Sequence, residues 1–204
     1  MSGEVAREGW FDIVSLNVSE RTGTRKKPVR SLCLVEGRGV AGDAHEGLIE
    51  NRQVSFLAAE EIEAASATLC GAYGGRGGAR GAAAEPSVQD GEGGGAGEGA
   101  APGEGAAPGE GAAPGAAALQ ELKPGDFAEN VTTRGVRLHE LPLGTVIEMG
   151  DAVLELSKIG KECHAACEIR RLVGDCVMPR RGIFARVTKG GTVSNADRGH
   201  YRIG

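Results

Sequence analysis

The sequence predicts a mainly β protein, a barrel of short strands with a few short helices, interrupted by a disordered insert. Short segments with alternating or β-branched apolar residues recur at close spacing, and Gly and Pro turns separate them. Such a pattern is typical of antiparallel barrels. Clear helical periodicity occurs in one stretch only. A run of Gly, Ala, Pro and Glu at residues 71–118 breaks the strand pattern.

Before the insert, three segments have the apolar pattern of strands: 11–18, 29–35 and 53–57. Residues 37–43 are rich in Gly and are expected to form a turn. A helix is expected over 58–69, because Ile62, Ala65 and Leu69 share one helical face. Two glutamates in its first turn suit the positive end of the helix.

The insert at 71–118 holds nearly half of the chain's 35 glycines, and three copies of Gly-Glu-Gly-Ala-Ala-Pro run from Gly97 to Pro114. These repeats contain no large apolar residue that could stack inside a solenoid. The segment therefore cannot offset the entropy cost of ordering, and we expect it to be a disordered tether. It divides the barrel into a first part, residues 1–70, and a second part, residues 119–204.

After the insert, four further segments have strand character: 127–133, 145–149, 152–157 and 184–188. The tail at 192–199 lacks a clear turn signal, so the course of the last strand stays open. The insert carries six acids and two arginines, a net −4 of the chain's −5, which leaves the remainder near −1. A near-neutral body argues against general nucleic-acid binding, which needs a broad basic face.

The N-terminus carries charges where a signal peptide needs an apolar core, and no run is long enough to span a membrane. We therefore expect a soluble, cytoplasmic protein with no membrane partner. An odd count of 5 cysteines in a reducing compartment makes structural disulfides unexpected.

The richest chemistry lies in residues 157–186, where three of the five cysteines and one histidine stand among seven cations. Cys163, His164, Cys167 and Cys176 could ligate a metal, supply an activated thiol or simply pack as small hydrophobic residues. Their spacing lacks the two tight pairs that are typical of structural zinc. Neighbouring cations stabilise a thiolate, and they would equally stabilise an anionic cofactor.

Two other polar groups stand beside predicted strands. His45, Arg52 and Gln53 offer an imidazole, a guanidinium and an amide at the entrance of a strand, which suits the rim of a ligand site. Lys26 and Lys27 follow two threonines in a tight loop, which suits a phosphate, although such charge runs are often only solvated surface.

Four segments in order resemble a stand-alone MOSC domain, the C-terminal domain type of the molybdenum cofactor sulfurases: 39–62, 122–135, 160–167 and 174–187. The resemblance implies a β-barrel that binds the pterin-based molybdenum cofactor (molybdopterin). It also implies a cysteine that ligates molybdenum or carries sulfur as a persulfide. Cys167 best matches that cysteine, Cys163 is the runner-up and His164 is a neighbour.

For the pterin and its phosphate the resemblance implies Arg52, Asn130 and the pair Arg180 and Arg181, with Lys26 and Lys27 behind them, and His45 is added from the ligand rim. The chain is too short for the aminotransferase-like domain that binds pyridoxal phosphate in the larger sulfurases, so no such site is expected.

Two functions follow from the resemblance. In the first, the chain is expected to act in cofactor maturation, where it receives sulfur from a cysteine desulfurase or serves a cofactor-biosynthesis protein. In the second, it is expected to be a subunit of a small molybdoenzyme that reduces N-oxides or N-hydroxylated substrates with electrons from a redox partner. A non-catalytic zinc-stabilised binding module, built on the cluster Cys163, His164, Cys167 and Cys176, is the alternative from another class.

Overall fold

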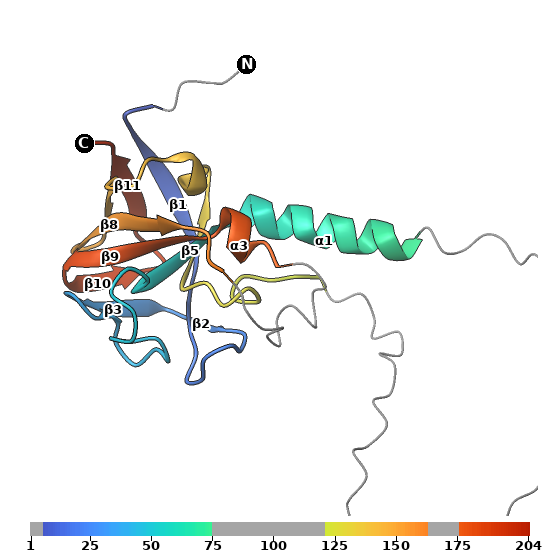
Figure 1. Ribbon diagram of the computed structural model, residues 1–204, viewed down its shortest axis with the longest axis horizontal. Helices are drawn as coiled ribbons and strands as arrows, with labels where there is room; N and C mark the ends of the chain where they lie inside the picture. The colour runs from blue at the N-terminus through green and yellow to red at the C-terminus, as the bar shows by residue number, and fades with distance from the viewer. Residues whose placement is uncertain (1–5, 75–120, 163–175) are drawn as a thin grey trace, which may run out of the picture.

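Seven strands close into a barrel in a computed structural model that describes residues 6–74, 121–162 and 176–204 (Figure 1). The barrel order is β11-β7-β8-β9-β5-β6-β1, and pairing of β1 with β11 closes the ring. The described elements in chain order are β1 (Glu8–Val18), β2 (Lys27–Val29), β3 (Ser31–Val35), β4 (Gly39–Val40), β5 (Val54–Ala58), α1 (Ala59–Gly74), β6 (Val131–Arg134), η1 (Leu138–Glu140), β7 (Val146–Met149), β8 (Ala152–Ile159), α3 (Met178–Arg181), β9 (Ile183–Lys189), β10 (Gly191–Ser194) and β11 (Arg198–Arg202).

The predicted mainly β barrel is confirmed, with one departure from a fully antiparallel arrangement. β5 and β6 pair in parallel, Phe56 opposite Val131, while the other barrel pairs are antiparallel. Parallel neighbours need a crossover connection. The chain makes that crossover through α1 and the residues up to 130, so the predicted insert falls inside the crossover. From residue 75 to residue 118 the insert lies outside the described residues.

The interior of the barrel is filled by alternate residues of its strands. Along β8, for example, Ala152, Leu154 and Leu156 are buried while their neighbours are partly exposed, as expected when one face of a strand lines a core. The small sheet β10-β3-β4 packs on the same core, because Leu32, Leu34 and Val193 join its apolar cluster.

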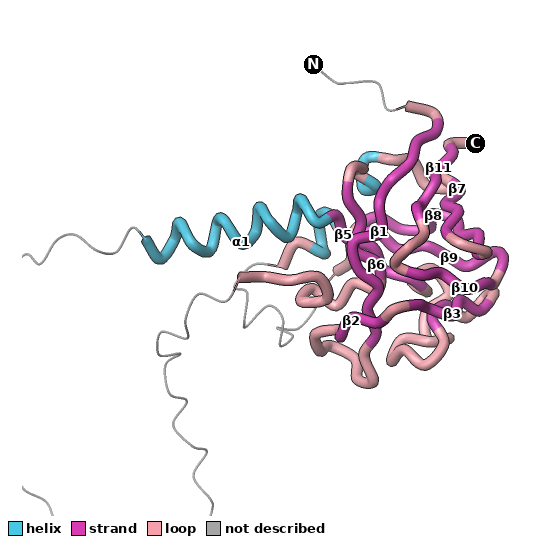
Figure 2. Tube along the Cα trace, turned by 180° about the vertical axis from the view of Figure 1, so that it is seen from behind, coloured by secondary structure: helices cyan, strands magenta, loops and turns pink. Residues whose placement is uncertain are grey.

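A second apolar cluster joins the base of α1 to α3 and to the loop before β6. Its buried members are Leu57, Ile62, Leu122, Phe127, Cys176, Met178 and Phe184. Among the α1 side chains that the structure describes, only those of the first turns contribute to it, and Figures 1 and 2 show the rest of the helix extending away from the barrel. The helix ends at Gly74, five residues beyond the predicted end.

Three boundaries differ from the sequence prediction. The segment 29–35 divides at Arg30, because β2 pairs with β1 whereas β3 pairs with β10. Residues 127–130 are not strand, since Ala128 adopts φ +62° and turns the chain before β6. The tail forms β10 and β11, and β11 closes the barrel. In the described part of the chain, no helix is both long and apolar enough to cross a membrane.

Candidate functional site

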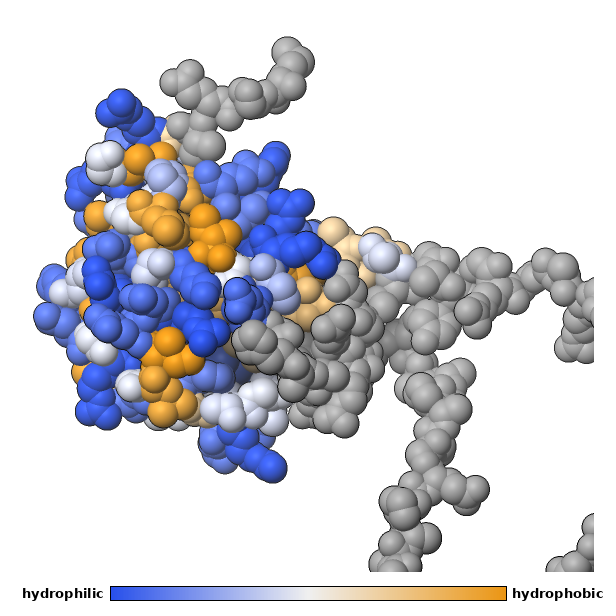
Figure 3. Space-filling model, viewed as in Figure 1, coloured by the Kyte–Doolittle hydropathy of each residue, from blue (hydrophilic) through white to orange (hydrophobic). Residues whose placement is uncertain are grey.

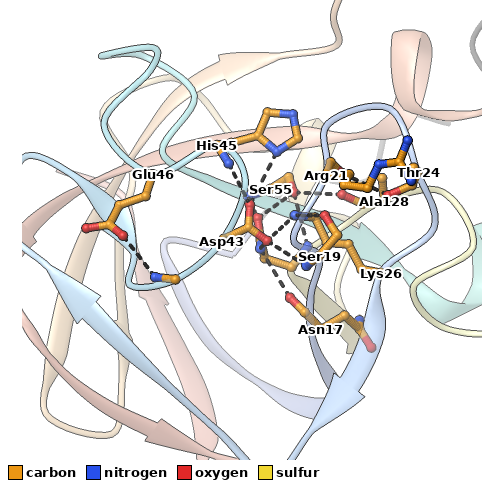
Figure 4. A network of polar contacts seen from close by, with 12 residues as sticks. Asn17, Ser19, Arg21, Thr24, Lys26, Asp43, His45, Glu46, Ser55 and Ala128 are labelled. Atoms are coloured by element: carbon orange, nitrogen blue, oxygen red, sulfur yellow. Dashed lines mark hydrogen bonds and ion pairs between the residues drawn. The ribbon is translucent and has the colours of Figure 1, made fainter.

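A buried polar network lies at the end of the barrel where β5 and β6 begin. It joins the β1–β2 loop, the β4–β5 loop and the turn before β6, three segments far apart in sequence (Figure 4). Loops that carry polar groups on a rigid barrel are the usual location of binding sites. The network therefore marks this end of the barrel as the candidate site.

Asp43 is the centre of the network. Its Oδ2 accepts hydrogen bonds from the Ser19 amide at 3.0 Å, from Asn130 Nδ2 at 3.3 Å and from the Lys26 ammonium. Its Oδ1 lies 3.1 Å from the His45 amide and 3.3 Å from His45 Nδ1. Burial alone would raise the pKa of Asp43, but the hydrogen bonds from His45 and Lys26 outweigh it and hold the pKa below its ordinary value. Asp43 is therefore an anion.

Lys26 neutralises this anion. Its side chain is buried against Asp43, and its Nζ lies 3.4 Å from Ser19 Oγ. Burial lowers the pKa of Lys26, while the nearby carboxylates of Asp43 and Glu129 oppose that fall and Lys161 adds to it. Lys27, the next residue, is exposed. Of the two lysines that were predicted to hold a phosphate, one is enclosed in an ion pair and the other faces solvent.

The Asn130 side chain ties three strands together. Its Nδ2 donates to the Asn17 carbonyl at 3.2 Å as well as to Asp43, and its Oδ1 accepts from Ser55 N at 3.2 Å and from Ser55 Oγ at 2.9 Å. Both ends of the amide are thus used by the protein. This geometry makes Asn130 a positioning residue that fixes the ends of β1, β5 and β6.

Glu129 is fully buried beside this network. Its Oε1 accepts from Gly125 N at 2.5 Å and from Thr132 Oγ1 at 2.8 Å, whereas its Oε2 has no hydrogen-bond partner in the described part of the chain. Burial raises the pKa of Glu129 from 4.5 to about 7, and the bonds from Gly125 and Thr132 only partly counter it. Glu129 is therefore a proton-holding group under the site.

His45 is the network member that reaches the surface, with 35% of its side chain exposed. Asp43 holds Nδ1, and Nε2 makes no hydrogen bond with the described residues. The chain thus orients the imidazole with one nitrogen inward and leaves the other for a ligand.

The structure describes the residues on both sides of the predicted cysteine centre. Cys163, His164 and Cys167 lie outside the described residues. Just before them, Gly160 N donates to the Gly182 carbonyl at 2.7 Å, which ties the end of β8 to the end of α3. A Cβ at Gly160 would lie 2.2 Å from the Pro179 carbonyl oxygen, so only glycine permits this approach.

Lys161 and Cys176, the described residues near the two ends of this segment, lie in different surroundings. Lys161, two residues before Cys163, acts electrostatically on Lys26 and adds to the lowering of its pKa. Cys176, at the other end, is buried in the second apolar cluster with Phe127 and Met178. Among the described residues, no group of three or more His, Cys, Asp and Glu side chains is arranged to hold a metal.

The predicted arginines occupy different places. Arg52 is half-buried, and its Cζ lies 6.0 Å from the centre of the Phe184 ring, at the base of the β4–β5 loop. Arg181 turns toward η1 and α1, where it donates to His139 Nε2 at 2.8 Å and lies 3.8 Å from Glu61. Arg180 is exposed on α3. The structure thus gathers Lys26, His45 and Asn130 into one network and directs Arg181 away from it.

Sequence reasoning missed the residues that organise the site. Asp43 stood inside a predicted Gly-rich turn, and Glu129 stood next to the predicted Asn130. A Gly-Asp pair before a histidine and a Glu-Asn pair before a strand are the only signals that could have found them. Ser19 and Ser55 gave no signal at all.

These features define a class, a small β-barrel domain with a loop-built polar site at one open end. The barrel is similar to the YuaD protein from Bacillus subtilis, with TM-score 0.62, 17% identity and coverage of 98% of this chain and 100% of that one. It is also similar to YiiM from Escherichia coli, with TM-score 0.53, 14% identity and coverage of 95% and 69%. YiiM from Geobacillus stearothermophilus gives TM-score 0.52, 15% identity and coverage of 92% and 72%.

Residues 110–198 match the family model of the MOSC domain, which confirms the resemblance found in the sequence. Over these residues the chain is therefore similar to the MOSC domain, a family associated in general with the molybdenum cofactor. No curated protein matches the chain.

Proposed function

We propose that the chain binds the molybdenum cofactor at the open end of the barrel and uses Cys167 as a molybdenum ligand or as a persulfide carrier. The observation that carries the proposal is the loop-built polar network itself, in which Asp43 holds Nδ1 of the half-exposed His45 and the charge of Lys161 acts on Lys26.

The residues present suit such a group. The cofactor carries a phosphate, and a soft thiolate is a preferred ligand of its metal. Lys27 and Arg52 offer exposed or half-exposed cationic groups for the phosphate. The buried pair of Lys26 and Asp43 is balanced in charge, so it holds the loops in place without competing for the ligand. When bound, the cofactor would supply the redox or sulfur-accepting centre.

The other predicted residues that the structure describes differ in their roles. Asn130 positions the strand ends, His45 contacts the ligand through Nε2, and Arg180 lies on α3 beside the end of the cysteine segment, whereas Arg181 keeps its contacts with His139 and Glu61. In the carrier version, the Cys167 thiolate attacks the persulfide of a desulfurase and takes its outer sulfur, and the donor cysteine leaves as a thiolate. In the enzyme version, Cys167 stays on the metal.

The test compares two cysteines that differ in position. Wild type, Cys167→Ser and the control Cys33→Ser, which alters an exposed cysteine on β3, are purified from a host that makes the cofactor. Molybdenum is measured by mass spectrometry and pterin by fluorescence after oxidation. We expect molybdenum and pterin in wild type and Cys33→Ser, and loss of molybdenum in Cys167→Ser. One equivalent of zinc without pterin would instead establish the zinc-stabilised binding module.

A second measurement separates carrier from enzyme. Incubation with a cysteine desulfurase, followed by alkylation and mass spectrometry, shows whether Cys167 or Cys163 gains a sulfur atom. A chain that gains no sulfur on either cysteine is not a carrier.

A further inference from the structure

A cavity of about 470 Å³ lies at the other end of β5 and β6 from the buried network. Its wall is formed by Ala58 at the end of β5, the first turns of α1, residues 135–141 after β6, and Tyr201 of β11. Its volume is in the range of sites for small molecules, about 300–1,000 Å³. Hydrophilic residues border the start of α1 on the face seen in Figure 3.

Tyr201 gives this cavity an unused polar group. The residue is 7% exposed and lines the cavity, and its hydroxyl makes no hydrogen bond with any described residue. A Cβ at Gly9, opposite Tyr201 in the β1–β11 pair, would lie 2.8 Å from the phenol oxygen, so the glycine leaves room for the ring. The hydroxyl oxygen is not one of the fully enclosed atoms, so a ligand that enters the cavity can reach it and form a hydrogen bond.

The charge of the lining favours a cation. The cavity is bordered by three carboxylates and one guanidinium: Glu60, Glu61, Glu140 and Arg137. Arg137 is paired with Glu140 at 2.9 Å. Glu60 accepts a hydrogen bond from Gly135 N through Oε1 at 2.9 Å. Glu61 Oε2 lies 3.8 Å from Nε of Arg181. The remaining lining is mainly apolar, and it includes Ala64, Val136 and Leu141.

We propose that this cavity binds a small organic cation, a primary amine on a short apolar body. The ammonium group donates to the carboxylates of Glu60 and Glu61 and to the Tyr201 hydroxyl oxygen, while the body covers Val136 and Leu141. The site uses none of the residues of the proposed cofactor site, so either can fail without the other.

The probe is 2-phenylethylamine, titrated into the full chain and followed by amide NMR shifts. We expect saturable shifts at Gly135 and Val136, and none with 3-phenylpropionate, its anionic counterpart. The neutral 2-phenylethanol is expected to bind at least about tenfold more weakly than the amine, because it lacks the charge.

Variants locate the site. Tyr201→Phe should weaken amine binding about three- to tenfold, the loss expected for one hydrogen bond. Ala64→Leu, at an exposed helix position, should fill the cavity and abolish binding while the fold is kept. Glu61→Gln should weaken binding, whereas Glu63→Gln, on the same helix but outside the lining, should not. The proposal is overturned by absence of saturable shifts, by equal binding of the acid, or by unchanged affinity in Ala64→Leu.

Discussion

Replacing Glu129 by glutamine should remove a pH dependence that the buried carboxyl imposes on stability. In the native state its pKa is raised from 4.5 to about 7, because burial disfavours the charged form. A raised pKa stabilises the fold fully below pH 4.5, and that stabilisation is lost as the pH rises through about 7. At about 1.4 kcal/mol per pH unit, the loss is about 3 kcal/mol.

The glutamine variant keeps the hydrogen bonds of the side chain and removes the carboxyl group that titrates. Its Oε1 can still accept from Gly125 N and Thr132 Oγ1, and its amide nitrogen replaces the partnerless Oε2. We therefore expect wild type and Glu129→Gln to be about equally stable near pH 4.5. Near pH 8 the variant should be more stable, by up to about 3 kcal/mol.

Urea unfolding at a series of pH values between these limits measures the difference directly. Other titrating groups, including Lys26 and Asp43, are common to both chains and largely cancel in the comparison. Glu36→Gln, at an exposed position, is the matched control and should parallel wild type at every pH. The reasoning is refuted if Glu129→Gln also parallels wild type, or if it loses stability relative to wild type as the pH rises.

Three further perturbations test the network and its surroundings. Lys26→Met should destabilise the fold by about 3 kcal/mol, because it leaves a buried carboxylate without its cation, whereas the exposed Lys27→Met should change the urea midpoint little. Gly160→Ala should cost about 2 kcal/mol in thermal or urea unfolding, since φ is +68° and the new Cβ would meet the Pro179 carbonyl oxygen. Deleting residues 75–115 should leave the unfolding free energy within about 0.5 kcal/mol, and a large fall in melting temperature would show that this segment is structural.

The barrel could be predicted where strands bury alternate large side chains. β8 shows this pattern plainly, with Ala152, Leu154 and Leu156 inside. β11 could not be found in this way, because its buried positions are Gly199 and Tyr201. Gly199 has no apolar side chain to signal burial, yet a Cβ there would lie 2.0 Å from Phe11 Cζ. A strand whose buried position is a glycine packs against the core without an apolar side chain, so the sequence shows no alternating hydrophobic pattern there.

The site was predicted as a set of ligand-binding residues, and the structure separates those residues by what they contact. Asn130 was predicted to bind the cofactor, but its side-chain amide already makes hydrogen bonds with Ser55, Asn17 and Asp43. No sequence pattern shows how many hydrogen bonds a side chain makes inside its own protein. The parallel pairing of β5 and β6, which brings Ser55 close to Asn130, is likewise a property of the closed ring and not of either strand.

The charge balance of the network also limits how loss of cofactor can be interpreted. Lys26 and Asp43 form a neutral buried pair, so the pair adds little net attraction for an anionic ligand. A Lys26 variant that loses the cofactor would therefore report a disordered loop, and not a lost phosphate contact. In the proposed function, attraction for the ligand comes from exposed or half-exposed cations such as Lys27 and Arg52, and contacts of that kind weaken as salt is raised. A cofactor affinity that falls with ionic strength in wild type, and falls less in Lys27→Met, would identify the lysine that makes the contact.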